Sequence, residues 1–63
     1  MKVKEVIKQL KSSDWVQVRQ ESSHRRFKKA GNPDVITVSG HDSQDVYAGQ
    51  LSDIRRTSGL PLR

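Results

Sequence analysis

The sequence contains no cysteine, few apolar residues and no long apolar run, and each absence excludes a class of protein. Without cysteine, a chain of 63 residues forms neither disulfides nor a thiolate metal site. No apolar run approaches the length of a membrane span or of a signal-peptide core, so we expect a cytoplasmic protein that makes no membrane contact. Because only 32% of the residues are hydrophobic, the core must be one thin layer within a single domain, residues 1–63.

Positive charge, by contrast, is abundant and unevenly distributed. Twelve Lys and Arg residues face seven acidic residues, which gives a net charge of +5. Residues 1–29 contain nine cations and three acids, whereas residues 30–63 contain three cations and four acids. A cationic field concentrated in one half of a chain indicates a polyanionic partner, most often nucleic acid.

The first segment has the spacing of an amphipathic helix. Four aliphatic residues fall at positions i, i+3, i+4 and i+7, namely Val3, Val6, Ile7 and Leu10. Three lysines border this apolar stripe, namely Lys4, Lys8 and Lys11. Lysines in this position usually form a solvated helix face, but they are also candidates for RNA binding.

The middle of the chain is typical of three strands. Residues 15–20, 24–29 and 35–39 are separated by polar turns and contain β-branched and aromatic residues. Side chains alternate across a sheet, so His24, Arg26 and Lys28 share one face while Phe27 lies on the other. Since Phe27 is the only apolar side chain in residues 24–29, its face meets the core and the histidine face meets solvent.

A second helix is expected to begin near residues 47–49, and Gly59 suits the left-handed position that ends a helix. The order is therefore α-β-β-β-α. It predicts an α+β fold, in which a three-stranded antiparallel sheet has both helices on one face and leaves the other face open.

His24 is the candidate group for proton transfer, and the cations beside it are candidates for phosphate binding. RNA cleavage without a metal ion requires a base near the ribose 2′-hydroxyl and positive charge around the phosphate. A neutral imidazole suits the first task because histidine changes charge close to neutral pH. Arg26 and Lys28 would supply the second. On the residues alone, however, a lone histidine in a basic strand is more often a binding or surface residue.

Other polar and aromatic residues have two interpretations each. His41 is either a second proton-transfer group or a plain loop residue. Ser23 either orients the imidazole of His24 or simply begins the strand. Trp15 either lies in the core or stacks on an RNA base. No third ligand accompanies the two histidines, so we expect no metal site and no cofactor.

Two groups of residues, in their order and spacing, match a known family. The first group lies in the first two strands and comprises Trp15, Arg19, Gln20, Ser23, His24 and Phe27. The second group lies towards the end of the chain and comprises Thr37, Val38, His41, Asp45, Val46, Gly49, Leu51, Ile54, Gly59 and Leu60. With both groups in place, residues 3–60 resemble the HicA family, small bacterial toxins that act as mRNA interferases.

The resemblance implies a fold like that of the double-stranded-RNA-binding domain. It also implies a metal-independent endoribonuclease that cleaves mRNA and depends on His24 as general acid or base. The expected partner is a HicB-type antitoxin that covers the active face. The residues expected to bind RNA are Lys4, Lys8, Lys11, Arg19, Ser23, Arg26 and Lys28.

The sequence departs from the family pattern in two places, and two alternative functions stay open. Ser22 replaces a glycine before Ser-His, which would strain the backbone if that position needs a positive φ. The loop at residues 42–45 is acidic where the family is usually basic, which would weaken RNA binding or alter antitoxin pairing. The alternatives are a non-catalytic double-stranded-RNA-binding module and a protein that binds only another protein through its open strand face.

Overall fold

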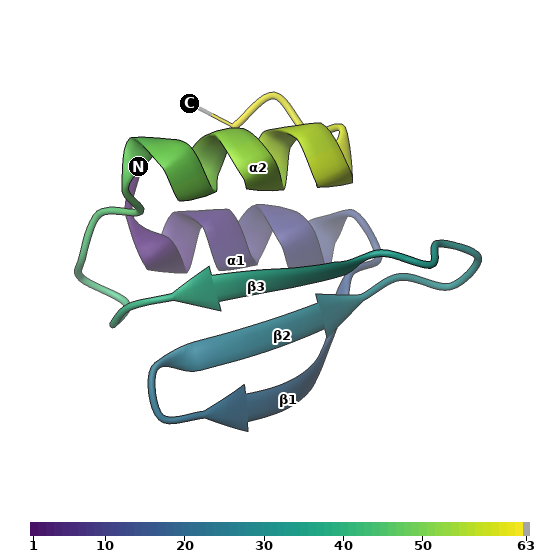
Figure 1. Cartoon of the computed structure of the whole chain (residues 1–63), viewed down its shortest axis with the longest axis horizontal. Coiled ribbons are helices and arrows are strands. Elements are labelled where there is room, and N and C mark those ends of the chain that lie inside the picture. Colours follow the sequence, from purple (N-terminus) through teal and green to yellow (C-terminus); the bar gives the residue numbers. More distant parts are fainter. Residues whose placement is uncertain (63) are drawn as a thin grey trace.

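The chain forms a helix, three strands and a second helix, which confirms the predicted α-β-β-β-α order (Figure 1). A computed structural model describes residues 1–62. Arg63, the last residue of the expected domain, lies outside the described residues. The elements are α1 (Val3–Ser12), β1 (Val16–Glu21), β2 (His24–Lys28), β3 (Val35–Ser39) and α2 (Ala48–Ser58). The three strands form one antiparallel sheet in the order β1-β2-β3.

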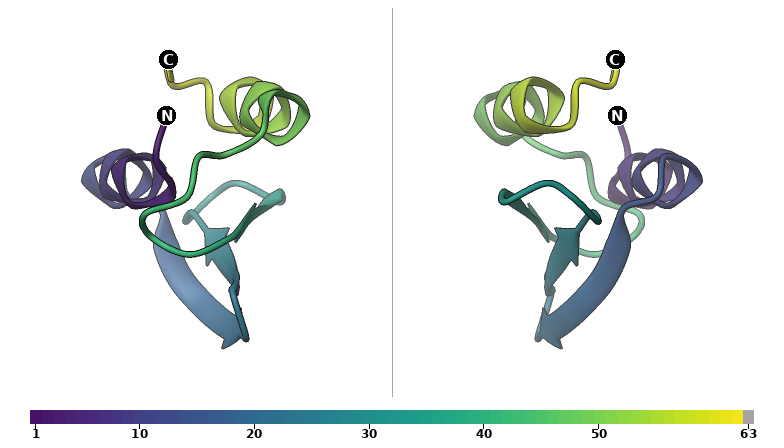
Figure 2. Two further views of the ribbon diagram at one scale, coloured as in Figure 1. Left: turned by 90° about the vertical axis from the view of Figure 1, so that its left-hand side faces the viewer. Right: turned by 90° about the vertical axis from the view of Figure 1, so that its right-hand side faces the viewer.

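Both helices pack on the same face of the sheet, and the other face is open (Figure 2). The core lies between these two layers and comprises Val3, Val6, Ile7, Leu10, Trp15, Phe27, Ile36, Val38, Val46, Ile54 and Leu62. Trp15 is 2% exposed, so it is a core residue rather than an RNA-stacking platform. Neither α1 nor α2 has the length and apolar content that a membrane crossing requires.

Helix α1 buries the predicted stripe of four aliphatic residues, but its first turn is capped in a way that the local sequence does not reveal. No side chain caps its N-terminus. Instead, the backbone N–H groups of Val3 and Lys4 donate to the carbonyls of Gln44 and Asp42, at 2.8 and 3.2 Å. These bonds satisfy donors that would otherwise lack partners in the first turn. They hold the loop between β3 and α2 against α1.

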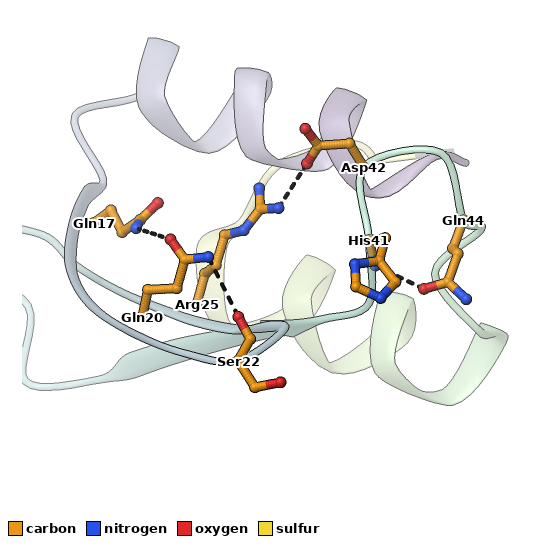
Figure 3. Close-up of polar contacts among 7 residues, drawn as sticks. All are labelled: Gln17, Gln20, Ser22, Arg25, His41, Asp42 and Gln44. Carbon is orange, nitrogen blue, oxygen red and sulfur yellow. Dashed lines mark hydrogen bonds and ion pairs between the residues drawn. The ribbon is translucent and has the colours of Figure 1, made fainter.

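A β-bulge at Val18 interrupts the pairing of β1 with β2. Gln17 lies opposite Phe27 and Arg19 lies opposite Arg26, so Val18 has no partner. Beyond the bulge, alternation is shifted by one residue. The side chains of Gln17 and Gln20 therefore lie on the same, helix-facing side of the sheet, and Gln17 Nε2 donates to Gln20 Oε1 at 3.3 Å (Figure 3).

The backbone φ angles of two turn residues, Gly59 and Ser22, bear on expectations drawn from the sequence. Gly59 has φ of 73°, and its N–H donates to the carbonyl of Arg55, so it closes α2 in the left-handed position as predicted. Ser22 has φ of 54° in the turn between β1 and β2. Ser22 therefore occupies a position with a positive φ, where the resemblance leads us to expect a glycine and where a serine is strained.

Candidate active site on the open sheet face

The open face carries three rows of residues that lie directly opposite one another on adjacent strands. Directly opposite residues share a face of the sheet, so each row runs across the open face. The rows are Glu21–His24–Ser39, Arg19–Arg26–Thr37 and Val16–Lys28–Val35. The first two are polar or charged throughout, and the third places one lysine between two exposed valines.

A pocket of about 260 Å³ lies over the first two rows and is lined by Arg19, Glu21, His24, Arg26 and Thr37. The two arginines lie directly opposite each other in the β1–β2 ladder. Like charges in this position destabilise a sheet. An anion between the two guanidinium groups would relieve that repulsion, so the arrangement favours binding of a phosphate.

The two arginines differ in how their charge is compensated. Arg19 forms an ion pair with Glu21 on the same strand. Within residues 1–62, no carboxylate lies within ion-pair distance of Arg26, and its side chain is exposed. Arg26 is therefore the guanidinium available to an incoming phosphate. A guanidinium suits this task because its planar fork donates two parallel hydrogen bonds to phosphate oxygens.

The imidazole of His24 is oriented by the hydroxyl of Ser39, which is itself bound by the side-chain amide of Gln50. His24 Nδ1 lies 2.9 Å from Ser39 Oγ, which in turn accepts a hydrogen bond of 3.2 Å from Gln50 Nε2 on α2. The same amide nitrogen also donates to the carbonyl of Thr37, and the backbone N–H of Ser39 donates to Gln50 Oε1. A hydroxyl both donates and accepts, so Ser39 can keep its contact with Nδ1 in either protonation state. The other ring nitrogen of His24, Nε2, is the one that can contact a substrate.

The other predicted RNA-binding residues do not share this pocket. Lys28 lies on the open face but in the third row, beside Val16 and Val35. Ser23 lies half-buried in the turn, and the hydroxyl beside the imidazole is that of Ser39 instead. The three remaining cations are exposed on α1, which packs on the opposite side of the sheet, and are Lys4, Lys8 and Lys11.

His41 and the acidic loop also lie outside the pocket. His41 is exposed, and its backbone N–H donates to Gln44 Oε1 at 2.6 Å (Figure 3). Asp42 forms an ion pair of 2.7 Å with Arg25, whose side chain lies on the helix-facing side of β2. Asp45 lies 3.6 Å from Lys2. The acids of this loop therefore neutralise cations on the helix-facing side of the sheet rather than those around His24.

Three residues of the site were not singled out from the sequence, namely Glu21, Ser39 and Gln50. Glu21 reaches the pocket because of the bulge, and no local pattern in β1 predicts that bulge. Alternation along β3 does predict that Ser39 lies on the face opposite to Val38. Only the pairing register of β2 with β3, however, places Ser39 next to His24. In residues 1–62, no cluster of three or more His, Cys, Asp or Glu side chains is arranged to hold a metal ion.

Comparison with known proteins identifies one family. The family model described as the HicA toxin of bacterial toxin–antitoxin systems matches residues 3–60. That match covers the whole fold from α1 to the residue after Gly59. No curated protein sequence matches the chain significantly.

Proposed function

Because the chain belongs to the HicA toxin family of bacterial toxin–antitoxin systems, we propose that it is an endoribonuclease that cleaves mRNA without a metal ion. The observation that carries this proposal is the shared pocket of His24 and Arg26 on the open sheet face. A group that moves protons and a cation that binds phosphate lie there within reach of one scissile bond. Both are exposed, so an RNA strand reaches them without rearrangement of the fold.

The three rows of residues on the open face indicate how the RNA backbone binds. The phosphate at the cleavage site binds to Arg26, with Arg19 directly opposite it in the ladder and also lining the pocket. Lys28 lies two residues farther along β2, a step of about 6–7 Å. It contacts the phosphate of a neighbouring nucleotide. These contacts hold the backbone and do not read the bases.

The chemistry is attack of the ribose 2′-oxygen on the adjacent phosphorus, with loss of the 5′-oxygen of the next nucleotide. His24 Nε2 moves a proton in this step, a contribution typically worth about 10²–10⁴ in rate. Negative charge builds on the phosphate oxygens as the fifth bond to phosphorus forms. Arg26 stabilises that charge because its donors are already in place before the reaction.

A toxin of this kind is paired with an antitoxin, and we propose a HicB-type protein that covers the open face. Val16, Val18 and Val35 are 61, 55 and 48% exposed. Val16 and Val35 flank Lys28 in the third row, directly beside the pocket. Exposed apolar side chains next to a charged pocket suit a protein partner better than they suit solvent.

The direct test is RNA cleavage in the presence of a chelator, by the native protein and by His24→Ala. We expect the native protein to cut and the variant to leave RNA intact, with growth arrest on expression only for the native protein. Co-expression of the antitoxin should relieve the arrest. Tight RNA binding without cleavage by the native protein would instead support the non-catalytic binding module.

A further inference from the structure

The proposed reaction requires two proton movements, and His24 accounts for only one of them. The attacking 2′-hydroxyl loses a proton, and the leaving 5′-oxygen gains one. His41 was the sequence candidate for the second group, but it does not line the pocket. Glu21 does. We propose that Glu21 is the general base that accepts the 2′-hydroxyl proton, while His24 is the general acid. This inference rests on the proposed function.

The backbone places Glu21 and His24 together. They flank the two-residue turn and lie directly opposite each other in the β1–β2 ladder. Cβ atoms of such a pair are about 4.5–5.5 Å apart. The carboxylate is 57% exposed and is fixed by its ion pair with Arg19, so it is both accessible and oriented. Without the bulge at Val18, alternation would turn Glu21 to the other face.

The chemical types of the two groups decide their roles. An ionised carboxylate only accepts hydrogen bonds and protons. An imidazolium donates from both nitrogens, and Ser39 Oγ accepts the Nδ1–H because Gln50 occupies only one of its two lone pairs. This leaves Nε2–H as the donor that faces the substrate. Glu21 is therefore suited to the base and His24 to the acid.

The step balances in atoms and charge. Glu21 takes the 2′-hydroxyl proton as the 2′-oxygen forms a bond to phosphorus. The bond between phosphorus and the 5′-oxygen breaks, and its electron pair takes the proton from His24 Nε2. The products are a 2′,3′-cyclic phosphate and a 5′-hydroxyl, with Glu21 protonated and His24 neutral. Proton exchange with water restores both groups.

An RNA with sulfur in place of the leaving 5′-oxygen separates the two roles, because a thiolate leaves without being protonated. On ordinary RNA, Glu21→Gln and His24→Ala should each lose about 10²–10³-fold in rate. On the 5′-thio RNA, His24→Ala should recover to within about tenfold of the native rate, whereas Glu21→Gln should not recover. The matched control is Glu5→Gln on α1, which should cleave both substrates at the native rate.

A second measurement separates proton transfer from mere positioning of Arg19. The native pH–rate profile should be bell-shaped, and Glu21→Gln should lose the limb on the acid side. In an Arg19→Ala background, Glu21→Gln should still cost more than tenfold, since its effect does not pass through that ion pair. Melting curves of the variants check that each is folded.

Three results would overturn the assignment. The first is a Glu21→Gln rate within about threefold of native on ordinary RNA. The second is recovery of Glu21→Gln, rather than of His24→Ala, on the 5′-thio substrate. The third is loss of the Glu21→Gln effect when Arg19 is already alanine. In each case native cleavage would leave the proposed ribonuclease function standing, whereas a native protein that cuts no RNA would remove both.

Discussion

Two cationic surfaces of this small protein have similar charge but different chemistry. On α1, Lys4, Lys8 and Lys11 lie along one exposed side over about 10 Å. On the open sheet face, the cations of β1 and β2 surround an imidazole, a carboxylate and two hydroxyls. Charge alone attracts an RNA, but proton transfer needs groups of different types at one point. We therefore propose that α1 contributes to RNA capture and that the open face carries out cleavage.

The largest expected effect separates the two histidines. His24→Ala should lower cleavage by at least about 10²-fold, because it removes the proposed proton-transfer group from the pocket. RNA affinity should change by less than about threefold. His41→Ala is the control, since that side chain lies outside the pocket, and it should cleave at the native rate. Equal losses in the two variants would contradict the placement of the chemistry on the open face.

Arg26 comes next in expected effect. Arg26→Ala should lower kcat/KM by about 10²-fold, because one preorganised donor to the developing phosphate charge is lost. Arg26→Lys should recover only part of this, since an ammonium lacks the bidentate fork. The matched control is Arg56→Ala on α2, where the guanidinium pairs with Asp53 at 2.9 Å. A native rate for Arg26→Ala would show that the pocket does not hold the scissile phosphate.

The helix surface should affect binding rather than chemistry. Replacing Lys4, Lys8 and Lys11 together by glutamine should weaken RNA affinity about tenfold at moderate salt. For single-stranded RNA, the slope of log K against log salt should fall by about two, since three phosphate contacts are lost. Saturating kcat should stay native. A loss of kcat in this variant would mean that α1 takes part in positioning the scissile bond.

The smallest expected effect concerns the turn that joins the strands of Glu21 and His24. Ser22→Gly should raise the free energy of unfolding by about 0.5–1 kcal/mol. A positive φ costs a serine about 1–2 kcal/mol, and the greater freedom of glycine in the unfolded chain offsets part of the gain. Chemical denaturation measures the change. A destabilised glycine variant would show that Ser22 makes a contact that outweighs the strain.

The sequence predicted the parts of this molecule that depend on local pattern. The stripe from Val3 to Leu10 and the end of α2 at Gly59 both follow from short-range spacing, and the structure confirms them. The solvent-facing side of β2 also follows, because Phe27 is the only apolar side chain there and must be buried.

The rest of the site depends on how distant segments meet. Ser39 comes to His24 only through the β2–β3 register, across fifteen residues of sequence. Gln50 joins them because α2 packs beside the edge of β3. A bulge at Val18 decides which side of β1 faces the pocket. No periodicity within one segment encodes these relations, and the local sequence therefore left them open.

The most direct test of the proposed mechanism is whether cleavage requires the 2′-hydroxyl of the RNA. We predict that an RNA carrying a 2′-O-methyl group at the cleavage position stays intact in the presence of the native protein. The unmodified RNA should yield fragments with 2′,3′-cyclic phosphate and 5′-hydroxyl ends. Cleavage of the methylated RNA at the native rate, or fragments with 3′-hydroxyl and 5′-phosphate ends, would contradict the account.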